Sequence, residues 1–470
     1  MSPGYRTIIW FEQGGTLDEV TVIGAGLAGS EAAWQLACRD VPVRLIEMRP
    51  SVMPPAHGSD GFAELVCSNS LKSEDPSTAA GLLKRELAAL GSLVLAVARE
   101  SAVPAGAALA VDRVVFSRRI TELLSSHPRI TVVREEASAI PAGDVIVAAG
   151  PLPSSAIERA LSALVGEDRL AFFDAAAPIV EAGTVDREVA FAASRWGKGG
   201  GADYLNCPMD RAQYEAFVGA LLGARRVRAK PFERRELFAA CQPIEEVARS
   251  GMDALRYGAL KPVGLVDPRA GARPWAVVQL RPENRAGTAY NLVGFQTNLA
   301  FEEQTRVFRT IPGLERADFL RYGVMHRNTF IDAPRLLTPR LALRTDPRVR
   351  IAGQIAGTEG YLEAAGTGLL AGLDVWVART GADPAVLPDT TALGSLVAYA
   401  TDPETQDYQP MHVNFGLVPT LEVPVRGKRT RFAAYAQRAT RDLDSFLLAR
   451  RDLNVQSCAF ETAAAVKQAS

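Results

Sequence analysis

The chain has 470 residues with 52 Lys plus Arg against 53 Asp plus Glu, which gives a formal charge of −1, and 48% of its residues are hydrophobic. This composition is typical of a globular protein and excludes an intrinsically disordered chain or a small disulfide scaffold. The length allows about two to four domains, each with its own core. Even the apolar stretch 82–97 carries charged side chains, so we expect no segment that spans a membrane.

Cysteine and histidine usage gives no sign of a metal site. The five cysteines are an odd number without CxxC spacing, and the four histidines lie far apart without HExxH or HxH spacing. This pattern fits neither a disulfide framework nor a zinc site, so we expect a cytoplasmic protein that binds no metal. The first nineteen residues lack the basic start, apolar run and small-residue cleavage site of a secretory signal.

The first predicted unit is a strand, a glycine turn and a helix. Residues 20–23 read VTVI, mostly apolar as in a buried strand, and apolar residues then recur at helical spacing through 28–37. Between and within these segments Gly24, Gly26 and Gly29 form a GxGxxG motif. The first glycine permits a tight turn, the second lets the backbone approach a pyrophosphate, and the third allows close packing of helix on strand. The phosphates would lie at the positive N-terminal end of the helix.

An acidic residue follows at the position that a dinucleotide site requires. Glu47 directly follows the next apolar run, 41–46, and lies twenty-three residues after Gly24. A carboxylate at this position would bind ribose hydroxyls. A carboxylate there repels a 2′-phosphate, which favours FAD or NAD over NADP. Glycines occur in tight turns of any α/β protein, which is the alternative explanation. Because the strand, the helix and the acidic residue occur in the order and at the spacing of a dinucleotide-binding motif, we predict a dinucleotide site.

Two later segments favour FAD as the dinucleotide. Residues 144–153 predict a buried strand that runs into a glycine turn, and residues 348–372 predict a strand, a glycine turn and a helix that begins near Gly360. Flavoproteins with two dinucleotide folds often contain strands of both kinds. The positive end of the later helix would point at the flavin pyrimidine ring and stabilise negative charge there. A packing helix rich in glycine and alanine, with no ligand, is the alternative.

The predicted fold class is α/β, with a discontinuous Rossmann-like FAD-binding domain and an inserted α+β domain. We assign 18–165 and 322–400 to the FAD-binding domain and 166–321 to the insert, which would contact substrate and tRNA. Residues 401–470 are assigned to a C-terminal loop and helix, with the final helix predicted over 430–451.

Eight sequence blocks together resemble the bacterial folate- and flavin-dependent tRNA (uracil-5-)-methyltransferases. They keep their order from Gly24 to about Val418, and most of them are longer than a cofactor fingerprint. The blocks are AGLAGSEAAWQLA, FAELVCSNSLKS, VPAGAALAVDR, YLNCPM, KPVGL, GVMHRNTF, GTEGYLEAAGTG and QPMHVNFGL. The flavoprotein family that modifies the wobble uridine of tRNA shares a block like GQIAGTEGY, but the NSLKS block fits it poorly. That family would also carry a further C-terminal domain.

The resemblance implies a specific reaction. Methylenetetrahydrofolate would supply a one-carbon unit, reduced FAD would pass it to C5 of a uridine in the T-loop of tRNA, and NAD(P)H would reset the flavin. Because C5 of uracil is not nucleophilic by itself, a thiolate that adds at C6 would activate it. Cys67 in LVCSNS and Cys241 in AACQPIEE match family positions with assigned roles. We expect Cys241 to attack the uridine and Cys67 to act near the flavin, with exchanged roles as the alternative.

The surroundings of both cysteines support a reactive thiol. Cys241 precedes a helix predicted over about 244–250, whose dipole would favour a thiolate, and Cys67 begins a polar loop that contains Lys72. Most free cysteines are buried small apolar residues, which is the alternative for both.

The predicted cofactor-binding residues lie in the glycine turns or directly beside them. They are Gly24, Ala25, Gly26, Leu27, Ala28, Gly29, Glu47, Gly353, Gln354, Gly357, Glu359, Gly360 and Tyr361. One position departs from the family, because Asn298 stands where a histidine thought to stack near the folate is frequent. Trp196, Tyr361 or His326 would then supply an aromatic face, and Tyr361 beside the flavin helix is the best placed.

A tRNA substrate requires positive surface, which a net charge of −1 provides only if basic residues cluster. One cluster before Cys241 contains the predicted RNA contacts Arg225, Arg228 and Lys230, and a second lies over 426–441. A run of charges is usually only a solvated surface. The target uridine must leave the T-loop stack, so we expect base flipping. The alternatives are a wobble-uridine enzyme and a non-catalytic protein that binds FAD and RNA.

Overall fold

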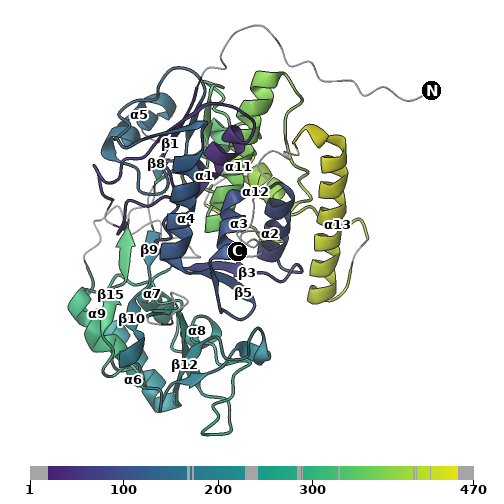
Figure 1. Ribbon diagram of the computed structural model, residues 1–470. Coiled ribbons are helices and arrows are strands. Elements are labelled where there is room, and N and C mark those ends of the chain that lie inside the picture. The colour runs from purple at the N-terminus through teal and green to yellow at the C-terminus, as the bar shows by residue number, and fades with distance from the viewer. Residues whose placement is uncertain are drawn as a thin grey trace, which may run out of the picture.

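The computed structural model describes residues 19–453, except 55, 167–169, 172–173, 228–241, 283–286, 288, 327–328, 406–407, 409 and 424. The described residues form two lobes, which Figure 1 shows one above the other. The upper lobe contains a parallel sheet between helices, and the lower lobe contains an antiparallel sheet. No helix in these ranges is long and apolar enough to cross a bilayer.

The upper lobe is built on a five-stranded parallel sheet with the order β18-β7-β1-β2-β6. Its strands are β1 (Val20–Ile23), β2 (Val43–Ile46), β6 (Ile130–Val133), β7 (Val145–Val147) and β18 (Val349–Ile351). Every residue of β1, β7 and β18 is buried, as expected for a parallel sheet covered on both faces. Because β18 pairs with β7 across the whole inserted segment, this domain is discontinuous, and the predicted fold class is confirmed.

Helices α1 (Leu27–Ala37) and α11 (Tyr361–Thr380) lie side by side against this sheet. Their backbones approach closely because α11 presents glycines to α1. A Cβ added at Gly368 would lie 2.1 Å from the carbonyl oxygen of Ala28, and one at Gly372 would lie 2.9 Å from that of Ala32. This contact joins the first glycine turn to the start of α11.

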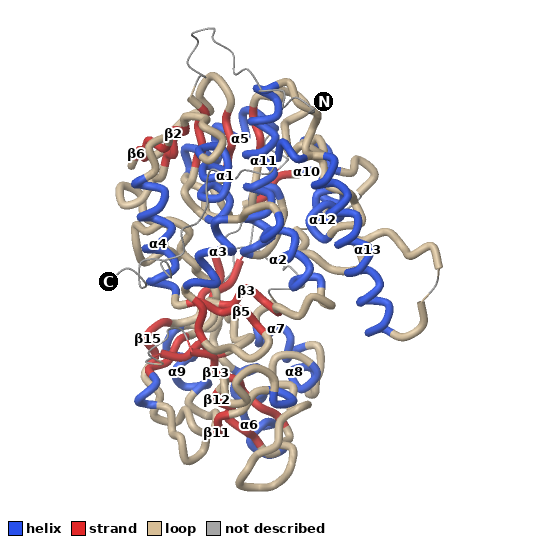
Figure 2. The backbone as a smooth tube through the Cα atoms, turned by 45° about the vertical axis from the view of Figure 1, so that its right-hand side comes forward, coloured by secondary structure: helices blue, strands red, loops and turns tan. Residues whose placement is uncertain are grey.

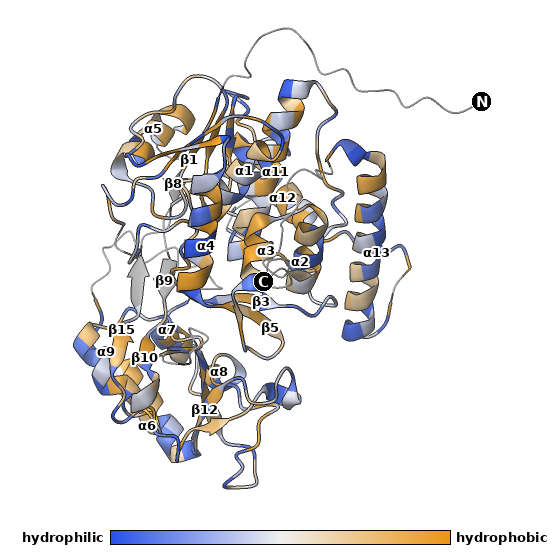
Figure 3. Ribbon diagram, in the orientation of Figure 1, coloured by the Kyte–Doolittle hydropathy of each residue, from blue (hydrophilic) through white to orange (hydrophobic). Residues whose placement is uncertain are grey.

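The remaining described helices of the upper lobe cover the sheet and the α1–α11 pair. They are α2 (Ala79–Ala89), α3 (Leu93–Glu100), α4 (Arg113–Ser126), α5 (Ser155–Val165), α10 (Ala333–Leu336), α12 (Ala392–Thr401) and α13 (Lys428–Ala449). Buried carboxylates hold two of these helices at their first turns. Glu31 accepts from the N–H groups of Leu93 and Val94, and Glu86 accepts from those that begin α12. The outermost helix is α13, whose polar and apolar faces are visible in Figure 3.

Short strands connect the two lobes. A three-stranded sheet has the order β3-β5-β4, with β3 (Ser70–Ser73), β4 (Ala102–Val103) and β5 (Ala108–Val111). Two-stranded pairs are formed by β8 (Leu170–Ala171) with β17 (Phe330–Ile331) and by β9 (Asp174–Ala176) with β16 (Val324–His326). Figures 1 and 2 both show β3 and β5 at the junction, directly above the lower lobe.

The lower lobe contains an antiparallel sheet with the order β11-β12-β13-β14-β10-β15. Its strands are β10 (Ile179–Glu181), β11 (Phe191–Ala192), β12 (Leu205–Met209), β13 (Ala276–Pro282), β14 (Ala289–Leu292) and β15 (Phe319–Arg321). The helices are α6 (Arg211–Gly223), α7 (Ile244–Arg249), α8 (Ala254–Tyr257) and α9 (Phe301–Phe308).

The two faces of this antiparallel sheet differ in chemistry. Alternate residues such as Cys207, Leu280 and Leu292 belong to the apolar core of the lower lobe. The residues between them put a polar row on the other face, made of Asn206, Gln279, Arg281 and Asn291, and all four are buried. A buried polar row needs hydrogen-bond partners, and Arg281 finds its partners in the upper lobe.

Candidate functional site

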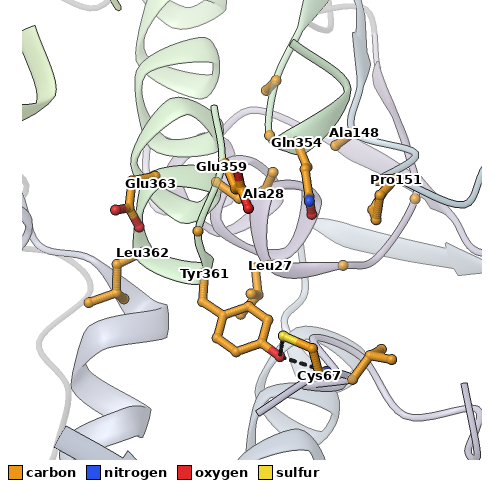
Figure 4. A pocket seen from close by; sticks show the side chains of 18 of the residues that line it. Leu27, Ala28, Cys67, Ala148, Pro151, Gln354, Glu359, Tyr361, Leu362 and Glu363 are labelled. Atoms are coloured by element: carbon orange, nitrogen blue, oxygen red, sulfur yellow. Dashed lines mark hydrogen bonds between the residues drawn. The ribbon is translucent and has the colours of Figure 1, made fainter. Parts of the chain in front are cut away.

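A cavity of about 880 Å³ lies at the carboxyl ends of the parallel strands. Ile23 at the end of β1, Ile46 at the end of β2 and Ala148 after β7 all line it. The starts of α1 and α11 form another part of the wall. Ligands of open α/β sheets bind at this edge, so the fold places a ligand site here. Figure 4 shows the part of the cavity around Tyr361.

The three glycines of the GxGxxG motif have different surroundings. Gly24 has a φ of +95°, and a Cβ there would lie 2.5 Å from the carbonyl oxygen of Ala148. A Cβ at Gly29 would lie 1.8 Å from the carbonyl oxygen of Gly24, so only glycine lets α1 pack so closely on the turn. A Cβ at Gly26 would meet nothing within 4 Å, and Gly26 lines the cavity. The turn is therefore open where a pyrophosphate would approach, and its residues fit FAD.

Glu47 directly follows β2 and lines the cavity, where hydrogen bonds from its neighbours hold it. Its Oε2 accepts a hydrogen bond from the N–H of Ala25 at 2.8 Å, and its Oε1 accepts from Arg49 Nε at 2.8 Å and Arg49 N at 3.1 Å. Burial alone would raise the pKa of Glu47, but the hydrogen bonds and charge of Arg49 lower it below its ordinary value. The carboxylate stays ionised with room for one more donor, which suits a ribose hydroxyl.

The turn before α11 forms the opposite wall. Gly353, Gln354, Glu359 and Gly360 line the cavity, and Gly360 precedes the helix with a φ of +114° and no side-chain cap. The first N–H groups of α11 are thus uncapped by a side chain at the cavity, where they favour negative charge. Three of the predicted cofactor residues, Ala25, Gly29 and Gly357, shape the turns without lining the cavity.

Cys67 and Tyr361 meet inside the cavity, as Figure 4 shows. The hydroxyl oxygen of Tyr361 accepts from Cys67 N at 2.9 Å and from Ser68 N at 3.0 Å, and it lies 3.0 Å from Cys67 Sγ. Two N–H donors occupy the acceptor positions of the phenol, so its own O–H is directed at the sulfur. Burial and the neighbouring Cys67 raise the pKa of Tyr361 well above its ordinary value. Tyr361 therefore keeps its proton and acts as a donor.

Three arginines hold the segment around Cys67. Arg113 Nη1 donates to the carbonyls of 65–66 at 2.9 and 3.0 Å, and Arg321 Nη2 donates to the second of these carbonyls at 2.5 Å. Arg281 donates to the side chains of 68–69 at 2.5 and 2.7 Å. Arg281 and Arg321 come from strands β13 and β15 of the lower lobe, so the insert fixes a segment of the FAD-binding domain. Sequence reasoning missed all three, although Arg113 ends the block VPAGAALAVDR, because nothing local marks Arg281 and Arg321 as partners of a distant segment.

The far end of the cavity is lined by the C-terminal segment. Lys72 Nζ forms an ion pair with Glu363 Oε1 at 2.8 Å, and the N–H of Val413 points at the same oxygen at 3.4 Å. His412 also lines this end, and burial together with the charge of Lys72 lowers its pKa. The sequence analysis did not single out His412, although the block QPMHVNFGL contains it.

Several predicted residues lie elsewhere. Cys241, Arg228 and Lys230 fall outside the described residues, so their roles stay predictions. The helix expected after Cys241 over about 244–250 is α7, which spans Ile244–Arg249 with Pro243 as its N-cap. In the described part of the basic cluster, Arg225 pairs with Glu302 at 2.7 Å.

Of the other cysteines, Cys38 and Cys207 lie in the described residues, and neither lines the cavity. Cys207, left undecided by the sequence, is fully buried in the core of the lower lobe, where burial raises the pKa of its thiol. Cys38 is disulfide-bonded, so the expectation that the chain forms no disulfides is wrong at this residue. Pairing depends on proximity in the fold, which the spacing of cysteines does not reveal.

The aromatic residues considered for a folate contact differ in whether they line the cavity. Trp196 is 65% exposed and does not line the cavity, whereas Tyr361 does. The side chain of His326 is outside the described part of the structure. The backbone N–H of Asn298 donates to Glu245 at 2.7 Å, and Asn298 does not line the cavity.

Comparison with known proteins agrees with this architecture. The family model for glucose inhibited division protein A matches residues 19–383. The structure of Aquifex aeolicus GidA superposes with a TM-score of 0.64 over 93% of this chain and 74% of its own, at 17% identity. At that identity the likeness shows the fold alone.

Relatives of higher identity cover almost the whole chain. The methylenetetrahydrofolate--tRNA-(uracil-5-)-methyltransferase TrmFO of Heliobacterium modesticaldum is 56% identical over 429 residues, 91% of this chain and 98% of its own. The protein of the same name from Geobacter sulfurreducens is 54% identical over 429 residues, with the same coverage of both chains. This chain therefore belongs to the glucose inhibited division protein A family of flavoproteins and, within it, to the methylenetetrahydrofolate--tRNA-(uracil-5-)-methyltransferases.

Proposed function

We propose that the protein methylates C5 of a uridine in the T-loop of tRNA, with methylenetetrahydrofolate as the one-carbon donor and NAD(P)H as the electron source. The observation that carries this proposal is the contact between Cys67 and Tyr361 inside a dinucleotide cavity. FAD, when bound there, supplies the reducing equivalents and carries the one-carbon unit. The names of the relatives supply the folate and the tRNA.

The residues that would hold FAD follow from their surroundings. The open backbone at Gly26 accommodates the pyrophosphate, and Glu47 has one acceptor position left for a ribose hydroxyl. The uncapped N–H groups at the start of α11 favour a negatively charged ring. Gly353, Gln354 and Glu359 complete this wall.

Cys67 is proposed to act next to the flavin with its sulfur polarised by the protein. The O–H of Tyr361 donates to the sulfur, and the guanidinium of Arg113 lies against the adjacent carbonyls. Both place positive charge near Sγ and stabilise a thiolate. The arginines of β13 and β15 keep the segment in position when the insert binds RNA.

Cys241 is proposed, from its sequence context, as the nucleophile for the uridine. Its thiolate would form a bond to C6 while the C5–C6 π pair moves to C5. C5 then forms its bond to the one-carbon unit, a base removes the C5 proton, and the C5–H electron pair forms a C5=CH2 double bond as the bond between this unit and its carrier breaks. A hydride equivalent that derives from NAD(P)H adds to the CH2 group to give the methyl, the C5–C6 double bond forms again, and the bond between sulfur and C6 breaks with return of its electron pair to sulfur. The uridine would be flipped out of the T-loop stack to reach this site.

A trapping experiment tests both thiols. tRNA with 5-fluorouridine at the T-loop target should form a covalent adduct with the wild-type protein, because fluorine replaces the C5 proton that has to leave. Cys241→Ala should abolish the adduct and methyl transfer while FAD stays bound, and Cys67→Ala should impair methyl transfer only. An adduct that persists in Cys241→Ala and disappears in Cys67→Ala would exchange the two roles.

The product identifies the target. Nucleoside analysis of tRNA from a strain without this gene should show loss of 5-methyluridine from the T-loop. Loss of a modified wobble uridine instead, with 5-methyluridine intact, would refute the proposal in favour of the wobble-uridine enzyme. An unchanged nucleoside profile would favour the non-catalytic FAD and RNA-binding protein.

A further inference from the structure

An exposed tryptophan of the insert lies outside the cavity and has no role in the site described above. Trp196 belongs to the short 3-10 helix η3 (Arg195–Gly197) and is 65% exposed. We propose that Trp196 is a stacking platform for an unpaired base of the tRNA substrate, a proposal that rests on the proposed function. The ring would hold the RNA in place while the target uridine enters the cavity.

One face of the indole ring is covered by backbone and the other is open. A Cβ added at Gly264 would lie 2.7 Å from Trp196 Cε2 and 2.8 Å from Trp196 Cδ2. These two atoms are shared by both rings of the indole and can be approached only from a face, so the ring lies flat on Gly264. Because Trp196 is nevertheless 65% exposed, the opposite face is accessible. A base can stack on such a face.

The backbone fixes the ring in a conformation that tryptophan rarely adopts. Trp196 has a φ of +55° and a ψ of +27°, in the left-handed region, which is costly for a bulky residue. Its N–H donates to the carbonyl of Gly264 at 2.9 Å, and Arg195 Nη1 donates to the carbonyl of Val263 at 2.7 Å. Both carbonyls belong to the block KPVGL. The ring is thus positioned before RNA binds, which lowers the entropy cost of stacking.

The loop after Trp196 is attached to the FAD-binding domain. Gly106 N donates to the carboxylate of Asp203, and Tyr204 Oη donates to the carbonyl of Ala105 at 3.0 Å. A Cβ at Gly199 would lie 2.5 Å from the Cα of Gly106, so the two backbones touch. This turn leads into β5, which pairs with β3, and residues of β3 line the cavity. A base on the ring would therefore have a fixed position relative to the cavity.

Exposed cations lie on both sides of the ring. Lys198 follows Trp196 by two residues, and Lys261 precedes the glycine under the ring by three. Both are exposed, and neither forms an ion pair with a described residue. Hydrogen bonds from Ser77 lower the pKa of Asp75, and the charge of Lys198 lowers it further, so Lys198 lies near the segment that follows β3. An open aromatic face beside free cations is typical of sites for single-stranded nucleic acid.

The tRNA substrate offers the ligand that such a ring binds. Loops of RNA present bases without a pairing partner, and proteins recognise these bases by stacking them on aromatic side chains. When the target uridine flips out of the T-loop, its neighbours lose a stacking partner. Trp196 can replace that partner, whereas it does not line the cavity in which FAD would bind.

Three variants test the proposal in the FAD-loaded full-length protein. Trp196→Ala removes the ring, and Trp196→Phe keeps a smaller ring. Tyr257→Ala is the matched control, because Tyr257 is another aromatic residue of the insert and is 80% exposed. Fluorescence anisotropy of a labelled T-arm RNA hairpin would measure binding at several salt concentrations. A second set of hairpins carries one abasic nucleotide, placed at each unpaired position of the loop in turn.

Trp196→Ala should weaken binding of the intact hairpin about tenfold, the usual effect of losing one stack between a base and an aromatic ring. Trp196→Phe should restore most of the affinity, and Tyr257→Ala should match the wild type. The salt dependence should stay the same in Trp196→Ala, because stacking neutralises no phosphate, whereas a collapsed loop would displace Lys198 and flatten it. At one loop position an abasic nucleotide should weaken binding to the wild type by about the same factor and have no further effect in Trp196→Ala.

Equal affinities of Trp196→Ala and the wild type would overturn the platform. Additive effects of Trp196→Ala and every abasic nucleotide would also overturn it, because the ring would then contact no base. An equal loss in Tyr257→Ala would assign the effect to general apolar surface. Unchanged RNA affinity with an altered oligomeric state would assign the ring to a contact between copies of the chain. A wild type that binds no T-arm hairpin would refute the proposed function itself, and the platform with it.

Discussion

The two ends of the cavity are built from different parts of the polypeptide. At the dinucleotide end the backbone forms the surface, with glycines at Gly24, Gly26 and Gly360 and N–H groups at helix starts. At the other end side chains, such as those of Lys72 and Phe432, form the surface. Backbone surfaces bind what all members of a fold share, whereas side chains are replaced easily. We infer that the fold supplies the cofactor site and that the side-chain end selects the substrate.

The largest expected effect tests the backbone end. Gly26→Val should give a folded but colourless protein, because a Cβ at this position would meet no protein atom within 4 Å and the side chain would occupy the open space at the turn. Gly29→Val should fail to fold, since a Cβ there would lie 1.8 Å from a carbonyl oxygen. Flavin absorbance and circular dichroism of both variants check this. A yellow Gly26→Val protein would show that the pyrophosphate does not approach this glycine.

The contact between α1 and α11 gives the next largest effect. Gly368→Ala should lower the free energy of unfolding by about 1 to 3 kcal/mol, the usual cost of overpacking, because its Cβ would lie 2.1 Å from the carbonyl oxygen of Ala28. Gly219→Ala in α6 is the control, since nothing lies within 4 Å, and it should stabilise by about 0.5 to 1 kcal/mol. Urea unfolding measures both. Equal stabilities would contradict the close helix contact.

Glu86 links α2 to the start of α12 and makes stability depend on pH. Burial raises its pKa to about 7, against the lowering effect of the N–H groups of Leu393 and Ala392. The unfolded chain loses this proton near pH 4.5, so folding becomes less favourable as pH rises from about 4.5 to 7 and then levels off. Glu86→Gln should flatten this decline in urea unfolding at pH 5 and pH 7.5. An identical decline in both proteins would assign it to other groups, such as Glu31, whose pKa burial also raises.

The smallest expected effect concerns the thiol between the two ends. Tyr361→Phe removes the O–H that donates to Cys67 Sγ, so alkylation of Cys67 by iodoacetamide should slow about tenfold, the value of one hydrogen bond to a charged group. Mass spectrometry would follow Cys67, with the buried Cys207 as the internal unreactive control. Faster alkylation in the variant would mean that Tyr361 shields the sulfur rather than activating it.

The parts of the site that the sequence predicts are those made by short segments. Strand, turn and helix around Gly26 follow from spacing within thirty residues, and the start of α11 after Gly360 follows from the same logic. Their agreement with the structure reflects local backbone requirements that few residues satisfy.

The remaining parts depend on contacts between distant segments. Arg281 and Asn69 are 212 positions apart, and Lys72 and Glu363 are 291 apart. An arginine in a strand looks the same in the sequence whether it meets solvent or another domain. The final helix was predicted over 430–451 and forms over Lys428–Ala449, but its position at the cavity depends on tertiary packing that periodicity does not encode. The same reason explains why His412 was overlooked.

The position of β18 has a consequence for how the protein is made. During synthesis the ribosome releases β1, β2, β6 and β7 long before β18, so the nascent chain holds a sheet with one unfinished edge while about two hundred residues are added. The apolar face of α1 also lacks its packing partner until α11 has been synthesised. Contacts between such distant segments slow folding, and an unpaired strand edge invites aggregation. Ribosome-bound chains cut before Val349 should therefore recruit chaperones, and extension through Thr380 should release them.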